Sequence, residues 1–262
     1  MGAVFDVTVF TLVYNHKPYL QQLFAGMAIQ DPIITVQWYI LDDASPDGSG
    51  EYIRTLLLTL PPNIHVTFIQ NHANIGATAS TVKIMDQPIQ GRYCMLLEGD
   101  DYFKAGFLQK TVYFLDHHPD YVAVHTDIDH YIAQNDRFVF DYWQTVGRIT
   151  SDGLSTKIPT GYIFEELLKH NFIQTCSFLM RTEVCLRYLD LQTYNNPPFE
   201  YHFMDYPLYL NMARMHKIGF IPESLAVYRI NLQGMNSNPA NRARMHYTTL
   251  RMIYDATHGR HI

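Results

Sequence analysis

The chain has 262 residues, of which 47% are hydrophobic and 17% charged, so it is long and apolar enough for a sizeable core and one large α/β domain. Its net charge of −6 and pI near 6.1 give no basic footprint, and we therefore expect no nucleic-acid partner. No apolar run approaches the roughly 20 residues that a membrane helix needs, so we expect no transmembrane segment.

The N-terminal sequence and the cysteines of the chain indicate a cytoplasmic location. The N-terminal sequence MGAVFDVTVF lacks a charged region and enters a strand pattern at once, which argues against a signal peptide. Cys94, Cys176 and Cys185 are odd in number and have no CxxC spacing, so we interpret them as reduced core residues. The 13 histidines show no HExxH-type zinc spacing, and we interpret them as ordinary surface or interior residues.

The first half of the chain alternates between strand and helix patterns. Its β-branched, apolar runs predict strands at Val4–Asn15, Ile34–Leu41, Ile64–Gln70 and Arg92–Leu97. Segments with helical spacing of apolar residues predict helices at Pro18–Gln30, Asp47–Leu60, Thr78–Met85 and Lys104–Pro119. Strict alternation requires crossover connections, and we therefore predict an α/β fold with a mostly parallel sheet flanked by helices.

The second half is less regular. Its predicted strands are Tyr121–Ile132, Arg137–Trp143, Phe172–Arg181 and Ala226–Ile230. Its predicted helices are Thr160–His170, Thr182–Leu189, Met204–Gly219 and Pro239–Ala256. Gln144–Pro159 is polar and rich in Gly, Ser and Thr, so we expect a mobile loop there, and Tyr194–Phe203 is expected to be a second loop.

Polar residues follow each predicted strand of the first half, where ligands of open parallel sheets bind. These strand ends read Tyr14-Asn15, Asp42-Asp43, Asn71–Gly76 and Glu98–Asp101. The last one holds three carboxylates in four residues, which repel one another unless a cation or hydrogen-bond donors offset them. A hard dication such as Mg²⁺ or Mn²⁺ takes oxygen ligands of this kind. The alternative is an Asp-rich turn that caps the next helix.

The other polar ends also have two interpretations. Asp42 and Asp43 can accept hydrogen bonds from a base or a ribose, or they can belong to an ordinary turn in DDASPDGSG. Gly76 in NHANIGAT permits close approach of a ligand to the backbone, or it lies in an ordinary loop. Asp205 starts a predicted helix, where an acid also complements the helix dipole. A P-loop is absent from the sequence, and GSGEYI lacks the third glycine of GxGxxG.

The combination of motifs is more specific than any one of them. In this order, the chain holds VTVFTLVYN, WYILDDASPDGSG, NHANIGAT, GRYCMLLEGDDYF, TCSFLMR and MDYPLYLNMARMHKIGFIPESLAVYRIN. Over roughly residues 4 to 237 these segments resemble family 2 glycosyltransferases of GT-A fold. LDDASPDGS resembles the family's VDDxSxDGT, NIG its NxG, YRIN its YRxH, and EGDD its metal motif in a version found in a bacterial subgroup.

The resemblance implies a Rossmann-like, mostly parallel central sheet with a smaller irregular acceptor-side region. It implies one continuous GT-A domain, with a nucleotide-sugar-binding half over residues 1–127 and an acceptor-binding half over residues 128–262. The nucleotide-binding residues that it implies are Thr11, Tyr14, Asp42, Asp43, Asn74, Gly76, Glu98, Gly99 and Arg229. The first four of these would hold the base, usually uracil, whereas Glu98 would lie near the ribose and Arg229 near the diphosphate.

The same resemblance implies the reactive groups. Asp100 would bind a divalent metal, Mn²⁺ or Mg²⁺, that bridges the two phosphates, with Asp101 close by. Asp205 would deprotonate the acceptor hydroxyl. One base and direct displacement invert the anomeric centre, so the expected enzyme is an inverting glycosyltransferase with a nucleotide-sugar donor, in the first place a UDP-sugar. The acceptor is expected to be a carbohydrate or a lipid-linked molecule of cell-surface polysaccharide synthesis, which leaves open a peripheral position at the cytoplasmic membrane face.

Four positions depart from the family pattern. Asn231 stands where the family often has His, Met204 where many relatives have Glu, Leu12 where Pro is common, and Glu98 where Asp is usual. The departure at Asn231 keeps open a catalytically inactive nucleotide-sugar-binding module. A nucleotidyltransferase is a further alternative, although YNHKPYL after the first strand is not the glycine-rich loop that such an enzyme would normally bring.

Overall fold

The structure is a computed structural model that describes residues 4–150, 153–155, 157–189, 205–230 and 239–258. Its main sheet has nine strands in the order β3-β2-β1-β4-β10-β6-β11-β5, with β7 paired to β6. These strands are β1 Phe5–Val13, β2 Val36–Asp42, β3 Ile64–Gln70, β4 Gly91–Leu96, β5 Tyr102–Phe103, β6 Tyr121–Ile132, β7 Arg137–Val139, β10 Phe178–Arg181 and β11 Lys217–Ile230. Two short strands, β8 Arg148–Thr150 and β9 Gly153–Ser155, form a separate hairpin.

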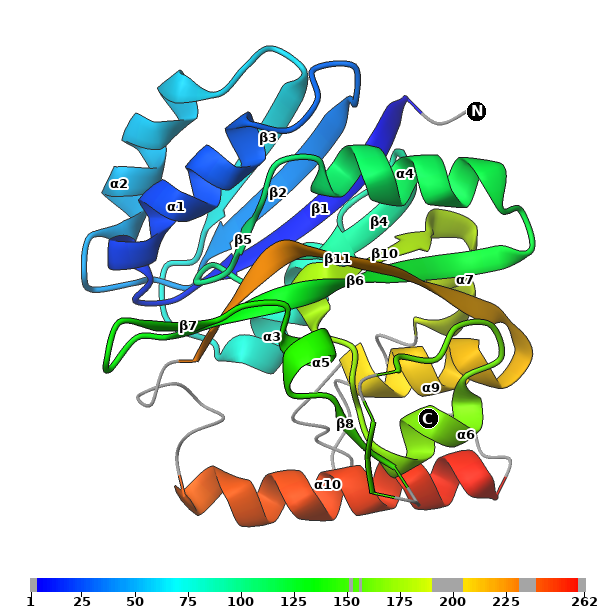
Figure 1. Ribbon diagram of the computed structural model, residues 1–262. Helices are drawn as coiled ribbons and strands as arrows, with labels where there is room; N and C mark the ends of the chain where they lie inside the picture. The colour runs from blue at the N-terminus through cyan, green and yellow to red at the C-terminus, as the bar shows by residue number, and fades with distance from the viewer. Residues whose placement is uncertain (1–3, 151–152, 156, 190–204, 231–238, 259–262) are drawn as a thin grey trace.

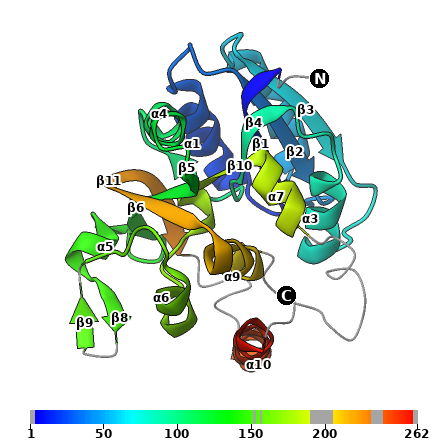
Figure 2. The same cartoon turned by 90° about the vertical axis from the view of Figure 1, so that its right-hand side faces the viewer.

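Helices cover both faces of the curled sheet. They are α1 Lys17–Ala28, α2 Ser49–Leu56, α3 Ala77–Met85, α4 Phe107–His117, α5 Tyr142–Thr145, α6 Phe164–Lys169, α7 Thr182–Tyr188, α9 Asp205–Met215 and α10 Pro239–Thr257. Helices α1 and α4 lie on one side of the sheet and α3 and α7 on the other, while α10 runs along the outside (Figure 1, Figure 2). Within the described residues, none of these helices has the length and apolar character needed to cross a membrane.

The long strand pairs are parallel, as predicted from the alternation of strand and helix. β1 pairs in parallel with β2 and β4, β2 with β3, and β6 with β11, whereas the short β10, β5 and β7 pair antiparallel. The predicted α/β fold is therefore confirmed. The expected division at residues 127 and 128 falls inside β6, and strands from both segments share one sheet, so that division remains a prediction about function.

The core forms because the parallel strands are covered on both faces. Every residue of β2 is buried, as expected of a central parallel strand. The Trp38 ring lies 4.8 Å from the Phe24 ring of α1, and this contact fixes α1 against the sheet. Cys94, Cys176 and Cys185 are free and buried, which confirms their interpretation as reduced core residues.

Three segments differ from the sequence prediction. The expected loop Gln144–Pro159 contains the β8–β9 hairpin, because backbone pairing between two strands does not require apolar residues. The helix expected to end at Gly219 ends at Met215, and the chain then enters the long β11, whose backbone pairs with β6. The expected short strand Ala226–Ile230 is the end of β11, and β5 was too short to give a periodic signal. Met204 and the expected loop Tyr194–Phe203 lie outside the described residues.

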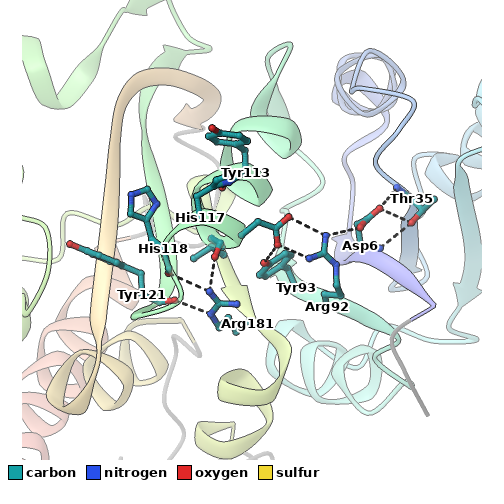
Figure 3. A network of polar contacts seen from close by, with 11 residues as sticks. Asp6, Thr35, Arg92, Tyr93, Tyr113, His117, His118, Tyr121 and Arg181 are labelled. Atoms are coloured by element: carbon teal, nitrogen blue, oxygen red, sulfur yellow. Dashed lines mark hydrogen bonds and ion pairs between the residues drawn. The ribbon is translucent and has the colours of Figure 1, made fainter.

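A polar network ties the sheet to α4 at the amino ends of the strands (Figure 3). The Arg92 guanidinium donates to Asp6 at 2.8 Å and to Asp116 at 2.6 Å, and the Tyr93 hydroxyl also donates to Asp116, at 2.6 Å. Burial acts to raise the pKa of Asp116, but the hydrogen bonds from Arg92 and Tyr93 outweigh it and lower the pKa below the ordinary 3.8. The network therefore joins β1, β4 and α4 at the edge opposite to the predicted site.

Replacing Asp116 with Asn is expected to lower the free energy of unfolding at pH 7 by about 1 kcal/mol, because the amide cannot accept charge-assisted hydrogen bonds. The folded-state pKa of Asp116 is lowered, so the stabilisation exists above the ordinary pKa and is lost as the pH falls through the folded value. The difference in Tm between wild type and Asp116→Asn should therefore shrink below about pH 4. Thermal unfolding from pH 7 to 3 measures it, and equal Tm values at pH 7 would contradict the role of this carboxylate.

Candidate active site

The carboxyl ends of the main strands meet at one edge of the sheet. Val13, the last residue of β1, pairs with Asp42 of β2, and β4 runs parallel to β1 on its other side. β6 and β11 run in the same direction as β1, because β10 is antiparallel to both β4 and β6. All polar strand ends that the sequence singled out therefore lie along this edge.

The turn Glu98–Asp101 extends directly from the end of β4 along β1. The backbone N–H of Gly99 donates to the carbonyl of Leu12 at 3.0 Å, and the N–H of Asp101 donates to the carbonyl of Glu98 at 3.1 Å. Position 99 must be glycine because a Cβ there would lie 2.7 Å from the Leu12 carbonyl oxygen and 2.5 Å from Nδ1 of His16. The turn is thus held close against β1 and His16.

The three carboxylates of this turn lie in different surroundings. Asp101 is 1% exposed and accepts a hydrogen bond from the backbone N–H of Arg229 at 2.8 Å. Burial, followed by the neighbouring charge of Asp100, raises the pKa of Asp101. Burial also raises the pKa of Glu98, to about 8, with further contributions from Asp100 and Asp205. Asp100 is partly exposed, so it is the member of the pair Asp100–Asp101 that a ligand can reach.

Arg229 connects the acidic turn to the second half of the chain. Its Nε donates to the backbone carbonyl of Asp100 at 2.8 Å, and its Nη2 donates to the side chain of Gln22. Its guanidinium lies 4.4 Å from the ring centre of Tyr19 and 4.7 Å from that of Tyr131, which are cation–π distances. Arg229, which belongs to β11, therefore connects the acidic turn to both β11 and α1.

Asp43 organises the loop after β3. Its carboxylate accepts hydrogen bonds from Nδ2 of Asn71 at 2.7 Å and from the backbone N–H groups of Ile75 and Gly76, each at 2.9 Å. Gly76 has a φ of 88°, which favours glycine, and a Cβ there would meet open space. Asn74, in the same loop, is exposed. The hydrogen bonds to Asp43 therefore fix a loop conformation in which Asn74 and Gly76 lie at the surface.

The remaining predicted nucleotide-binding residues are divided between surface and interior. Tyr14 is 43% exposed at the end of β1. Thr11 is fully buried and accepts a hydrogen bond from Nε1 of Trp38 at 2.8 Å. Asp42 is also fully buried and accepts from Nε2 of Gln70 at 2.9 Å and from the Ser45 hydroxyl. Thr11 and Asp42 thus support the edge from within, and their contact with a base remains a prediction.

Asp205 lies at the first position of α9, close enough to Glu98 for their charges to interact. The hydroxyl of Thr175 donates to Oδ2 of Asp205 at 2.9 Å. Burial raises the pKa of Asp205, and the hydrogen bonds from Thr175 and the Tyr206 backbone lower it by less. A carboxylate with a raised pKa is suited to accept a proton, as a general base must.

Sequence reasoning missed Thr175 and His16, and it left the contact of Tyr19 with Arg229 unseen. Thr175 belongs to TCSFLMR, a segment predicted to be a strand. In the structure, Thr175–Ser177 form a 3-10 turn, and the Thr175 hydroxyl donates to Asp205. His16 follows the Tyr14-Asn15 strand end and belonged to the histidines interpreted as ordinary. Its position directly after Asn15 was the one available signal.

The acidic residues fit a metal that takes only one or two protein ligands and completes its shell with ligand or water oxygens. Across the described ranges, no group of three or more His, Cys, Asp or Glu side chains is arranged to hold a metal ion by itself. Mg²⁺ typically takes one or two protein carboxylates and completes its shell with water and substrate phosphates. The partly exposed Asp100 would supply one such carboxylate. Its charge helps to raise the pKa of Glu98, and a nearby dication would offset this repulsion.

The structure is thus an α/β protein with a cluster of acidic residues at the carboxyl ends of its strands. The family model described as "Glycosyl transferase family 2" matches residues 8–188. The chain therefore belongs to glycosyl transferase family 2.

Two curated relatives illustrate this membership. "Uncharacterized protein Rv1520" of Mycobacterium tuberculosis is 27% identical over 266 residues, covering 97% of this chain and 69% of the relative. "Putative teichuronic acid biosynthesis glycosyltransferase TuaG" of Bacillus subtilis is 29% identical over 111 residues, covering 42% of this chain and 41% of the relative.

Solved structures agree on the GT-A-like fold. S. aureus TarS 1-349 in complex with UDP-GlcNAc has a TM-score of 0.67 at 15% identity, covering 96% of this chain and 66% of that chain. Mannosyltransferase PcManGT from Pyrobaculum calidifontis, in complex with GDP-Man and Mn²⁺, has a TM-score of 0.61 at 15% identity, covering 95% of this chain and 66% of that chain. This chain thus spans slightly less than two thirds of these solved chains. At such identities the likeness shows the fold alone.

Replacing Gly99 with Ala is expected to lower the free energy of unfolding by about 1–3 kcal/mol, because the new methyl group has no room beside Leu12 and His16. The loss should be smaller in the His16→Ala background, where one of the crowding groups is gone. Urea unfolding of the wild type, both single variants and the double variant measures this coupling. A Gly99→Ala chain as stable as wild type would contradict the described packing.

Proposed function

We propose that this protein is an inverting glycosyltransferase that moves a sugar from a nucleotide-sugar donor to an acceptor hydroxyl. The observation that carries the proposal is the placement of Asp205, with its raised pKa, beside the acidic turn that ends β4. Membership of glycosyl transferase family 2 and the GT-A-like fold support the same activity. We further propose a UDP-sugar as donor, which the family resemblance and the likeness to TarS with its bound UDP-GlcNAc support.

The donor's nucleotide is assigned to the edge formed by the ends of β1, β2 and β3. Tyr14 and Asn74 are exposed there, and Gly76 leaves open space beside its backbone for close approach of a ligand. The Asp43 carboxylate keeps this loop in place by accepting hydrogen bonds from its backbone N–H groups. Because a carboxylate has about four lone-pair sites, Asp43 can still accept a further hydrogen bond. Arg229 brings positive charge to the side of Asp100, where we place the diphosphate.

The transfer step is a direct displacement. Asp205 accepts the proton of the acceptor hydroxyl while that oxygen bonds to the anomeric carbon of the sugar. The bond from this carbon to the diphosphate oxygen breaks at the same time, and the nucleoside diphosphate leaves with the bonding electrons. Thr175 donates to Oδ2 of Asp205 and would hold the carboxylate in position during the step.

A divalent metal belongs to this proposal, with Asp100 as its protein ligand. Mn²⁺ or Mg²⁺ at that position would act as a Lewis acid on the leaving diphosphate and stabilise its growing charge. The EGDD motif also leads us to expect Asp101 beside the metal. Because Asp101 accepts a hydrogen bond from the Arg229 backbone N–H, its main role is to support the turn. The Mn²⁺ in the complex of PcManGT supports a dication in this fold.

The acceptor is proposed to be a carbohydrate or a lipid-linked molecule of cell-surface polysaccharide synthesis. The name of TuaG, a putative teichuronic acid biosynthesis glycosyltransferase, supports this class. A cytoplasmic protein, peripheral at the membrane when its acceptor is lipid-linked, fits such a task. Asn231, which kept open an inactive binding module, lies outside the described residues.

Replacing Asp205 with Asn is expected to lower the rate of sugar transfer by about 10²–10⁴-fold, because the amide cannot take the acceptor's proton. Donor affinity should stay within about twofold, since Asp205 is not assigned to the nucleotide. Transfer from a UDP-sugar panel and calorimetry with UDP measure the two quantities. Asp120→Asn, a change at the opposite edge of the sheet, is the matched control and should keep full activity. Full activity in Asp205→Asn would overturn the assignment.

Removal of metal should stop transfer. EDTA is expected to abolish turnover, and added Mn²⁺ or Mg²⁺ is expected to restore it, because without a dication the leaving diphosphate and the Asp100 carboxylate repel each other and the growing negative charge is not neutralised. The rate is measured before chelation, after chelation and after readdition of metal to the same sample. Unchanged turnover in EDTA would remove the metal from this account.

A further inference from the structure

His16 lies at the centre of the proposed diphosphate region. It immediately precedes α1, and its imidazole packs against Gly99, where a Cβ would come within 2.5 Å of its Nδ1. On another side, its ring centre lies 6.2 Å from that of Tyr19, the tyrosine that stacks with Arg229. His16 therefore lies against the turn that carries Asp100 and close to the contact between Tyr19 and Arg229.

The two ring nitrogens of His16 differ in their surroundings. Nδ1 is buried against Gly99 and has no hydrogen-bond partner in the described part of the chain. Nε2 also makes no hydrogen bond to the described residues. Unlike Nδ1, however, Nε2 is not among the fully buried atoms that lack a partner. A proton on Nδ1 would be a buried donor without an acceptor, which is costly, whereas a bare Nδ1 against Cα–H is cheaper. We therefore assign the proton of the neutral ring to Nε2.

The ring of His16 can offer a hydrogen-bond donor whatever its charge, although three carboxylates and one guanidinium surround it. Burial lowers the pKa of His16, while the charges of Asp100, Asp47 and Asp42 act to raise it and that of Arg229 to lower it. Nε2 carries a hydrogen in the neutral tautomer assigned above and equally in the protonated ring, so it is a donor in either state. An N–H donor cannot ligate a cation, but it can bond an anionic oxygen. A phosphate oxygen near Asp100 and Arg229 meets that requirement.

We propose that His16 is a donor-binding residue whose Nε2–H donates a hydrogen bond to a phosphate oxygen of the nucleotide-sugar. The inference rests on the proposed function, because that function places the diphosphate beside Asp100. It explains why a histidine, rather than an apolar ring, packs on Gly99, since packing alone does not need a ring nitrogen that finds no hydrogen-bond partner among the described residues. It adds a contact from the β1–α1 connection to those expected from Asp100 and Arg229.

Two substitutions separate the hydrogen bond from the packing. His16→Phe keeps a planar ring against Gly99 but removes the donor, whereas His16→Gln places an amide N–H near the position of Nε2. With saturating Mn²⁺, His16→Phe is expected to weaken UDP binding about tenfold, as loss of a hydrogen bond to a charged group predicts. Binding of uridine, which has no phosphate, should change less than twofold. His16→Gln should recover most of the affinity for UDP.

Calorimetry with UDP and competition by uridine measure these affinities in the full chain, after thermal unfolding confirms that each variant is folded. UDP affinity equal to wild type in His16→Phe would overturn the inference, and so would an equal loss for UDP and uridine, which would mean that His16 only shapes the site. A His16→Gln chain as weak as His16→Phe would also count against the hydrogen bond. Failure of the wild type to bind UDP would contradict the proposed UDP-sugar donor instead, so the two failures are distinguishable.

Discussion

Electrostatic repulsion within one turn is the constraint on which the site depends. Glu98, Asp100 and Asp101 lie within four residues, and the pKa of Glu98 is raised by burial and by the charge of Asp100. The hydrogen bond from the Arg229 backbone N–H to Asp101 offsets part of this repulsion, while burial raises the pKa of Asp101. The remaining charge, on Asp100, stays at the sheet edge where a dication or a cationic group of the site can meet it. Repulsion of this kind is what the proposed dication would offset.

Arg229 turns this local constraint into a connection across the molecule. β11 supplies its backbone, α1 supplies Gln22 and Tyr19, β6 supplies Tyr131, and the acidic turn supplies the Asp100 carbonyl. The segment expected to bind the nucleotide and the segment expected to bind the acceptor are therefore joined at the proposed diphosphate position. A single side chain thus contacts both expected binding regions.

The sequence was sufficient for the sheet of the first half and for its acidic edge, because long parallel strands are continuous apolar runs and their ends are abrupt. The sequence was insufficient where a motif does not show whether a side chain points into the core or toward the ligand edge. Thr11 and Asp42 stand in the expected motifs, yet the structure turns both inward, to Trp38 and to Gln70. Thr175 and His16 belong to segments that look ordinary, and they reach the site only because distant segments fold together. β5 and the β8–β9 hairpin are too short for any period to be counted.

The central claim is that Asp100 holds a divalent cation against the diphosphate of a nucleotide-sugar. Anomalous diffraction near the manganese absorption edge, from crystals grown with Mn²⁺ and UDP, tests it most directly. The account predicts one manganese peak at bonding distance from the Asp100 carboxylate and from oxygens of both phosphates. An Asp100 carboxylate turned away from bound UDP, with no manganese peak beside it, would contradict the claim.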